Sequence, residues 1–273
     1  MPVISANGTR FHVQRLSAAR DEAAPPGTVA PAVVFVHGLL IDNLSSFYYT
    51  LAGPVAIAGA RALMYDLRGH GRSDRPPGGY SVAGHVADLR ALLDALDVTE
   101  PAYLVGNSFG GLVAARMAVA APERVAGLAL IDASCAGPRS AAWLENILNT
   151  LAAQALRLEH DPGFAGRHRR AGQRRQADSA ETVNALLNET SLIEDLAAEQ
   201  PLDLADLAGL GCPVLGIFGE HSDLRDSAED LREHVPASRV EIVPGAAHYM
   251  LADAPGLVRA AVLDWLPFRK AIA

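Results

Sequence analysis

Ser108 stands in Gly106-Asn107-Ser108-Phe109-Gly110, where a strand-like run ends and an alanine-rich, helix-like run begins. A serine hydroxyl is a weak nucleophile until a base takes its proton. A tight strand-to-helix turn pushes such a side chain out of the sheet and aims the free N–H groups of the helix at the reaction centre. Glycines two residues before and after the serine relieve the crowding of this turn. The spacing therefore predicts a nucleophile for acyl transfer, with a surface serine in a glycine-rich turn as the alternative.

A nucleophilic serine needs a base, and the base needs an orienting acid. His248 lies in PGAAHYM, directly after the last strand-like run at 239–244, where a loop could bring it beside Ser108. We therefore predict His248 as the base. Four other histidines are less suitable. His37 is interpreted as structural, and His70 and His85 lack an acid at useful spacing. His221 is too close to the acid candidates to act as a separate base.

The negatively charged oxygen of an acyl-transfer intermediate needs two N–H donors already in place. The backbone N–H of Phe109, which follows the serine, is one candidate. The second is expected from HGLL, residues 37–40, after the first buried strand. Gly38 allows a tight turn there, and Leu39 is the predicted donor, since only its backbone is needed.

Short apolar runs alternate with helical patterns along the chain, which indicates βαβ units and a mostly parallel central sheet with helices on both faces. A hairpin signal at Asn7-Gly8 precedes them. The predicted strands are 3–5, 10–16, 32–36, 60–66, 102–106, 125–132, 213–219 and 239–244. The predicted helices are 82–96, the run after Ser108, 226–234 and 255–266.

Between about Gly137 and Leu204 the pattern is helical only. We predict a helical cap at 137–204, inserted after the strand that ends near Asp132, and a core formed by 1–136 and 205–273. Ligands of open α/β sheets bind at the carboxyl ends of the strands, so a cap there would enclose the site. Residues 17–31 are interpreted as a long surface loop.

The chain resembles the α/β-hydrolase superfamily over nearly its whole length. The resemblance is carried by HGLL (37–40), DLRGHGRSDRP (66–76), GNSFGG (106–111), PVLGIFGEHSD (213–223) and PGAAHYM (244–250). Their order is that of the superfamily: oxyanion loop, nucleophile, acid and histidine. The resemblance implies a serine hydrolase, while the substrate stays open because one fold hosts many reactions.

The acid departs from the pattern of the resemblance. In relatives it commonly lies three residues after the glycine that ends the PVLGIFG-type strand, and this position is Ser222. Asp223, one residue later, is the preferred candidate because a loop can absorb a shift of one. Asp132, which ends VAGLALID, is the alternative, as in polyketide-synthase-type thioesterases of this fold.

These residues predict a cofactor-independent, metal-free hydrolase of an ester or thioester that works through an acyl-enzyme on Ser108, in natural-product metabolism for example. A serine at this turn disfavours epoxide-hydrolase and dehalogenase chemistry, which uses a carboxylate nucleophile in this superfamily. Asn107 before the serine resembles meta-cleavage-product hydrolases, so C–C bond hydrolysis is an alternative, as is a natural-product cyclase or lactonase. A non-catalytic ligand-binding receptor is the alternative of a different class.

Composition limits the partners. The 273 residues carry a formal net charge of −8, which argues against general nucleic-acid binding. Neither a long apolar run nor a secretory signal is visible, and the two cysteines, Cys135 and Cys212, fit a reducing cytoplasm. We therefore expect a cytoplasmic protein with a small acyl substrate and no membrane. The basic run RHRRAGQRR, 167–175, could recruit an acyl-carrier protein or an acidic substrate, although a solvated surface is the more ordinary interpretation.

Overall fold

The computed structural model describes residues 2–19, 29–161, 163, 167, 170 and 173–268, and the centre of the molecule is an eight-stranded sheet. The strand order is β1-β2-β4-β3-β5-β6-β7-β8. β1 pairs with β2 and β2 with β4 in antiparallel fashion, whereas every other neighbouring pair is parallel. The predicted α/β fold with a mostly parallel sheet is confirmed.

All eight predicted strands form. Each end lies within one residue of the predicted bound. They are β1 (Val3–Ala6), β2 (Thr9–Leu16), β3 (Ala32–Val36), β4 (Arg61–Tyr65), β5 (Ala102–Asn107), β6 (Val125–Ile131), β7 (Val214–Gly219) and β8 (Ser238–Val243). The five residues of β3 and the six of β7 are all buried. Continuous apolar runs of this kind are typical of parallel strands that are covered on both faces.

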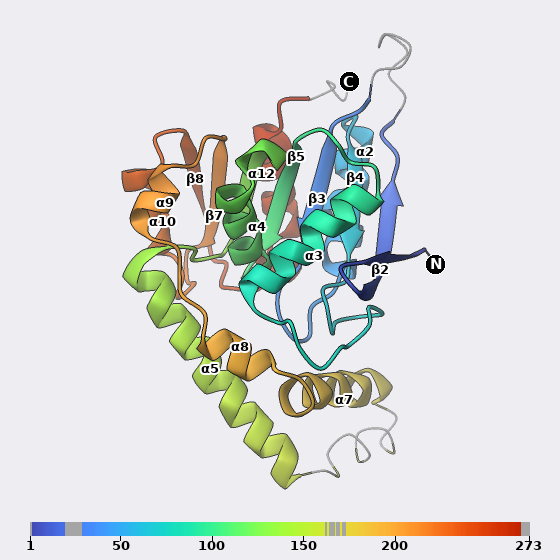
Figure 1. Ribbon diagram of the computed structural model, residues 1–273. Helices are drawn as coiled ribbons and strands as arrows, with labels where there is room; N and C mark the ends of the chain where they lie inside the picture. Colours follow the sequence, from blue (N-terminus) through green and yellow to red (C-terminus); the bar gives the residue numbers. More distant parts are fainter. Residues whose placement is uncertain are drawn as a thin grey trace.

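Helices cover both faces of the sheet (Figure 1). Successive strand side chains point to opposite faces, so Val34 and Val36 join one core and Val33 and Phe35 the other. The first core contains α3 (Val82–Ala95), α4 (Phe109–Ala120) and α10 (Ser227–His234). The second contains α1 (Ser45–Phe47), η1 (Tyr48–Ala52), α2 (Gly53–Ile57), α11 (Met250–Asp253) and α12 (Pro255–Trp265).

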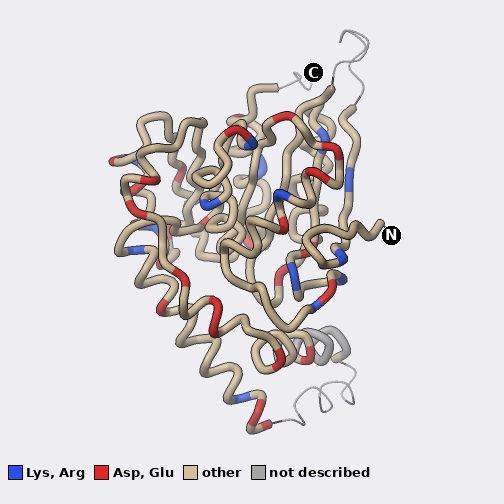
Figure 2. Tube along the Cα trace, viewed as in Figure 1, with Lys and Arg blue, Asp and Glu red and all other residues tan. Residues whose placement is uncertain are grey.

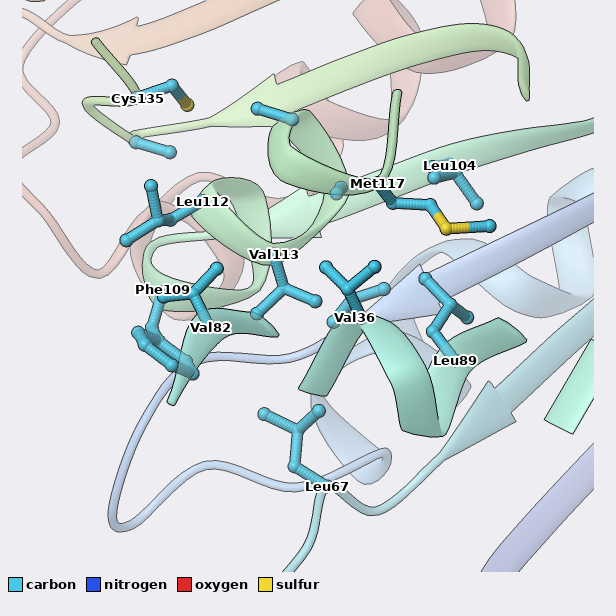
Figure 3. Close-up of a cluster of buried hydrophobic side chains, with 14 of the residues drawn as sticks. Val36, Leu67, Val82, Leu89, Leu104, Phe109, Leu112, Val113, Met117 and Cys135 are labelled. Atoms are coloured by element: carbon cyan, nitrogen blue, oxygen red, sulfur yellow. The ribbon is translucent and has the colours of Figure 1, made fainter. Parts of the chain in front are cut away.

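Helix α4 is buried around most of its circumference, which is why its sequence is apolar on every side rather than amphipathic. Its glycines and alanines let the helix approach the sheet closely, while Phe109, Val113 and Met117 gather with Val36 and Leu89 in the core (Figure 3). A helix packed this tightly is a rigid support for the residue that precedes it.

The sheet order reverses between β3 and β5, because β4 lies on the other side of β3 while β6 follows β5. Val36 pairs with Gly106, and Asn107 pairs with Ile131. The residues that follow these three strands therefore meet at one edge of the sheet. Open α/β sheets bind their ligands at such a reversal, outside the carboxyl ends of the strands.

After β6 the chain runs through helices until it returns to β7. These helices are α5 (Gly137–His160), α7 (Arg174–Asn188), α8 (Leu192–Ala197) and α9 (Leu204–Ala208). Figure 1 shows α5, α7 and α8 beyond one end of the sheet. The backbone N–H of Ser191 donates to the carbonyl of Pro77 at 2.8 Å, which ties this segment to the loop after β4.

The short helices at 45–57 and η2 (Pro122–Arg124) have no counterpart among the predicted elements. The segment at 45–57 changes from α-helix to π-helix and back within thirteen residues, and Gly53-Pro54 interrupts its pattern, so no apolar period is visible. Most of the predicted surface loop at 17–31 lies outside the described residues.

We expect Gly110→Ala to lower the free energy of unfolding by about 2 kcal/mol or more, since overpacked cores lose about 1–3 kcal/mol. A Cβ at position 110 would overlap the backbone carbonyl of Val36, which cannot move without distorting β3. Gly256→Ala in α12 is the control, because a Cβ there meets nothing within 4 Å. Urea denaturation measures both, and equal midpoints for the two variants would contradict the prediction.

Candidate active site

Ser108 occupies the turn between β5 and α4 with a φ of 53° and a ψ of −121°. A positive φ is costly for a residue with a side chain and persists only where the surroundings impose it. Its N–H donates to the carbonyl of Ile131 at 2.9 Å. A Cβ at Gly106 would overlap the backbone of Gly110, and one at Gly111 would overlap Ala133, so the turn closes only with glycines there. The side chain of Ser108 stays partly accessible.

His248 lies against Ser108, with Nε2 3.0 Å from Oγ. Its loop follows β8 and is held by the end of β7, because the N–H of His221 donates to the carbonyl of Ala246 at 2.8 Å. A Cβ at Gly219 would overlap the carbonyls of Ala246 and Ala247, so this glycine permits the close approach. His221, the competing histidine, thus contributes its backbone to the placement of His248.

Asp132 is the carboxylate that contacts His248, with Oδ2 2.6 Å from Nδ1. Its side chain is fully buried. The N–H of Gly219 donates to Oδ1 at 3.1 Å, and the hydroxyl of Ser222 donates to Oδ2 at 2.5 Å. A carboxylate only accepts hydrogen bonds, so Nδ1 of His248 carries a proton and Nε2 is left to accept the proton of Ser108.

The preference for Asp223 as the acid is wrong in this structure. Asp223 is exposed, whereas Ser222 beside it points inward to Asp132. Sheet register explains the outcome: Asn107 pairs with Ile131, so the next residue on each strand, Ser108 and Asp132, emerges side by side. The predicted alternative, Asp132, is the residue that the register brings to His248.

The HGLL loop lies directly against the nucleophile, since a Cβ at Gly38 would be 3.6 Å from Cβ of Ser108. Leu39 follows Gly38, and Phe109 is the first residue of α4, where helix N–H groups lack helical partners. Within the described ranges, neither the Leu39 N–H nor the Phe109 N–H donates to another protein group. Both therefore stay the predicted donors for a developing oxyanion.

Three side chains fix the loop on either side of Leu39. Asp42 accepts the N–H of Gly38 at 2.7 Å, and Nε2 of His70 accepts the N–H of Leu40 at 2.9 Å. Nδ1 of His37 lies 2.7 Å from the carbonyl of Gly38. The sequence interpretation missed Asp42 and His70 as supports. Asp42 accepts an N–H four residues earlier in the chain, and no local sequence pattern indicated this role.

His70 must be neutral to accept a hydrogen bond at Nε2. Burial, assisted by the neighbouring His37, lowers the pKa of His70 to about 3. Burial also lowers the pKa of His85 well below its usual value. His85 packs edge-on against Phe109 with ring centroids 5.3 Å apart, and neither of its ring nitrogens has a hydrogen-bond partner among the described residues. Charging either ring would therefore be costly.

The helical segment after β6 reaches back to the N-terminus of α3. The carboxylate of Asp195 accepts the N–H of Tyr80 at 2.7 Å, and Glu199 accepts the N–H of Val82 at 3.0 Å. Carboxylates at a helix N-terminus are favourable because helix N–H groups are free there. An open groove of about 680 Å³ lies between α5 and Asp223 in the loop after β7. It is lined by Asn146, Asn149, Thr150, Ala153, Gln154, Arg157 and Asp223.

The basic run at 167–175 falls mostly outside the described side chains. Arg167 is exposed and pairs with Asp161, and Arg170 is exposed. Figure 2 shows acidic residues on α8 and near the C-terminal end of α5, so the described part of the helical segment is not uniformly basic. Recruitment of an acyl-carrier protein stays a prediction.

Among the described residues, no group of three or more His, Cys, Asp or Glu side chains is arranged to hold a metal ion. No described helix is both long and apolar enough to cross a bilayer. Cys135 is buried, and burial raises the pKa of its thiol to about 12, so it does not provide a thiolate nucleophile.

A family model described as alpha/beta hydrolase fold matches residues 31–255. A putative 2-succinyl-6-hydroxy-2,4-cyclohexadiene-1-carboxylate synthase of Bacillus subtilis is 28% identical over 86% of this chain and 90% of its own length. A non-heme chloroperoxidase of Streptomyces lividans is 37% identical over 37% of this chain and 36% of its own length. The chain thus spans about a third of that relative.

The crystal structure of a hydrolase from Pseudomonas aeruginosa superposes with a TM-score of 0.67 at 26% identity and covers 96% of both chains. An enol-lactonase from Burkholderia xenovorans gives a TM-score of 0.71 at 21% identity, over 96% of this chain and 98% of its own. The second likeness bears on the fold alone.

We expect Asp132→Asn to lower kcat by about 10⁴, as loss of the orienting acid does in serine-protease triads. The amide would hold His248 in the wrong tautomer. Asp223→Asn is the matched control and should change kcat by less than about threefold, because an exposed carboxylate contributes little. Steady-state hydrolysis of a p-nitrophenyl ester measures both, and a larger loss at Asp223 would contradict the assignment.

We expect the free energy of unfolding to decrease as the pH falls from 6.5 to about 3, and His70 to account for part of this decrease. Its folded pKa lies below its unfolded one, so the unfolded chain binds the proton more readily, at a cost of about 1.4 kcal/mol per pH unit. His70→Gln should flatten this dependence in urea titrations at about pH 7.0, 5.5 and 4.5. The exposed His221→Gln is the control, and an unchanged pH slope in His70→Gln would refute the prediction.

Proposed function

The chain belongs to the α/β-hydrolase-fold family, and on that premise we propose that it hydrolyses an ester or thioester through an acyl-enzyme on Ser108. The observation that carries the proposal is the continuous contact from Oγ of Ser108 through His248 to the buried carboxylate of Asp132. Nucleophile, base and acid in such contact form the constellation of serine hydrolases.

In the first step, Oγ of Ser108 attacks the acyl carbon while Nε2 of His248 takes the hydroxyl proton. Asp132 stabilises the imidazolium that forms. The carbonyl oxygen becomes an oxyanion beside the N–H groups of Leu39 and Phe109. When the intermediate collapses, the bond to the leaving group breaks, and His248 gives its proton to the departing alcohol or thiol.

In the second step, a water molecule replaces the alcohol or thiol. His248 takes a proton from the water, and the resulting hydroxide attacks the acyl carbon of the ester on Ser108. When the second tetrahedral intermediate collapses, His248 gives this proton to Oγ of Ser108, the bond from the acyl carbon to Oγ breaks, and a carboxylic acid is released. Ser108 is half-buried rather than fully enclosed, which supports access of water to this ester.

We also propose that residues 137–204 form a cap that selects the substrate. Hydrogen bonds of Asp195, Glu199 and Ser191 to the loop at 77–82 support this role, since they hold the segment beyond the carboxyl ends of the strands. The groove beside α5 is lined mainly by polar side chains, of which Arg157 and Asp223 are charged, and this lining supports a substrate with hydrogen-bonding groups.

A second candidate is hydrolysis of a C–C bond. Asn107 favours this candidate, because an asparagine also precedes the serine in meta-cleavage-product hydrolases. Its Nδ2 lies 3.4 Å from Oδ2 of Asp42, the residue that accepts the N–H of Gly38. The match to a relative named as a synthase, over 86% of this chain and 90% of the relative, also supports chemistry other than ester cleavage. A chromogenic dienoic acid, assayed beside the ester, distinguishes the two candidates.

We expect Ser108→Ala to lower kcat on a short p-nitrophenyl ester by about 10⁴–10⁶, judged from triad dissections. Mass spectrometry of acid-quenched enzyme should show the acyl group on the peptide that contains Ser108. Ser238→Ala is the control, because Ser238 lies in β8 and bonds the backbone of Leu231. A folded Ser108→Ala protein with near-wild-type turnover would refute the serine mechanism, and a wild-type protein that binds esters without turnover would indicate a receptor.

A further inference from the structure

The carboxylate of Asp132 has a second side-chain partner besides His248. Oγ of Ser222 lies 2.5 Å from Oδ2 of Asp132, and Nδ1 of His248 lies 2.6 Å from the same oxygen. Both Asp132 and Ser222 are buried. The oxygen that orients the histidine is therefore shared with a serine that the reaction scheme above does not use.

The direction of the Ser222 hydroxyl proton follows from its other contacts. The N–H of Leu224 donates to Oγ of Ser222 at 3.1 Å, so Oγ is already an acceptor there. A carboxylate can only accept, and the proton of Ser222 must therefore point to Asp132. The N–H of Ser222 donates to the carbonyl of Gly219 at 3.2 Å, which fixes the residue at the end of β7.

We propose that Ser222 is a positioning residue of the active site, an inference that rests on the proposed serine-hydrolase function. The N–H of Gly219 holds Oδ1 of Asp132, and Ser222 holds Oδ2. With both oxygens held, the carboxylate cannot turn about its terminal bond, which has only broad rotational preferences of its own. The imidazole of His248 is thereby oriented before substrate arrives.

Relatives commonly carry their acid at the position of Ser222, and the same geometry tests whether a carboxylate there would still reach His248 in this chain. Oγ of Ser222 and Nδ1 of His248 touch one oxygen, so they lie no more than about 5 Å apart, a gap that one added hydrogen-bonding group spans. An aspartate at 222 carries its carboxylate oxygens one atom further than the serine hydroxyl. If the residue at 132 becomes short, the new carboxylate occupies the space that Asp132 vacates.

The first test separates positioning from stability. Ser222→Ala should lower kcat on a p-nitrophenyl ester about tenfold with KM unchanged, since a group that orients the catalytic histidine through Asp132 acts on the transition state. Ser222→Thr keeps a hydroxyl and should recover most of that loss. Ser227→Ala is the matched control, because this buried serine bonds Ser134 rather than Asp132. Wild-type kcat in a folded Ser222→Ala protein would overturn the positioning role.

The second test exchanges the two side chains. Asp132→Ser should lose about 10⁴ in kcat, although it retains Asp223, and the double variant Asp132→Ser/Ser222→Asp should be at least about tenfold faster than Asp132→Ser. Asp132→Asn/Ser222→Asp repeats the exchange with the volume at 132 preserved, in case the first pair folds poorly. If Ser222→Asp gives no increase in kcat over either Asp132→Ser or Asp132→Asn, a carboxylate at position 222 does not reach His248.

Labelling with a fluorophosphonate distinguishes failure of this inference from failure of the proposed function. The probe reacts with an activated serine, so the wild-type protein should be labelled and Ser108→Ala should not. Labelling of Ser108→Ala at the wild-type rate would mean that the serine mechanism itself is wrong. The role of Ser222 alone would be overturned by a different result. In that case the wild-type protein is labelled at Ser108, Ser222→Ala reacts like the wild type, and each double variant reacts like its Asp132 single variant.

Discussion

The positive φ of Ser108 is the constraint that organises the surrounding structure. Such a backbone conformation costs about 1–3 kcal/mol, so neighbouring packing must hold it. Helix α4 provides this packing because it is buried along most of its length, and the glycines at 106, 110 and 111 let it lie against β3 and β6 without a clash. This backbone conformation directs Oγ away from the helix that follows, so that a base can reach it.

The acid depends on sheet register in the same way. Asp132 also has a positive φ, and it leaves β6 one residue after the strand pairs with β5. The next strand, β7, then closes over its carboxylate with the N–H of Gly219 and the hydroxyl of Ser222. Three adjacent parallel strands thus deliver nucleophile, acid and support to one place, while His248 enters from the loop after β8.

The sequence predicted the sheet well because its strands are buried on both faces and read as continuous apolar runs. Ser108 and His248 could be found because each follows such a run directly. The choice between Asp132 and Asp223 could not be made in the same way, since it depends on which side of a loop each residue faces. The inward orientation of Ser222 leaves Asp223 exposed, and no local sequence signal distinguishes this arrangement from the opposite one.

The residues that perform the proposed chemistry and the residues that would choose the substrate lie in different layers. Ser108, Asp132 and His248 directly follow core strands or lie in a loop that one of them begins, and the HGLL loop is held by Asp42 and the buried His70, which accept hydrogen bonds on either side of Leu39. The groove beside α5 is lined instead by exposed side chains on one helix face. Exposed positions tolerate substitution at little cost in stability, generally within about 0.5 kcal/mol. If the helical segment is the proposed cap, substitutions there can change substrate preference while the catalytic geometry stays the same. This separation agrees with the observation that one fold hosts many reactions and that motifs alone do not name the substrate.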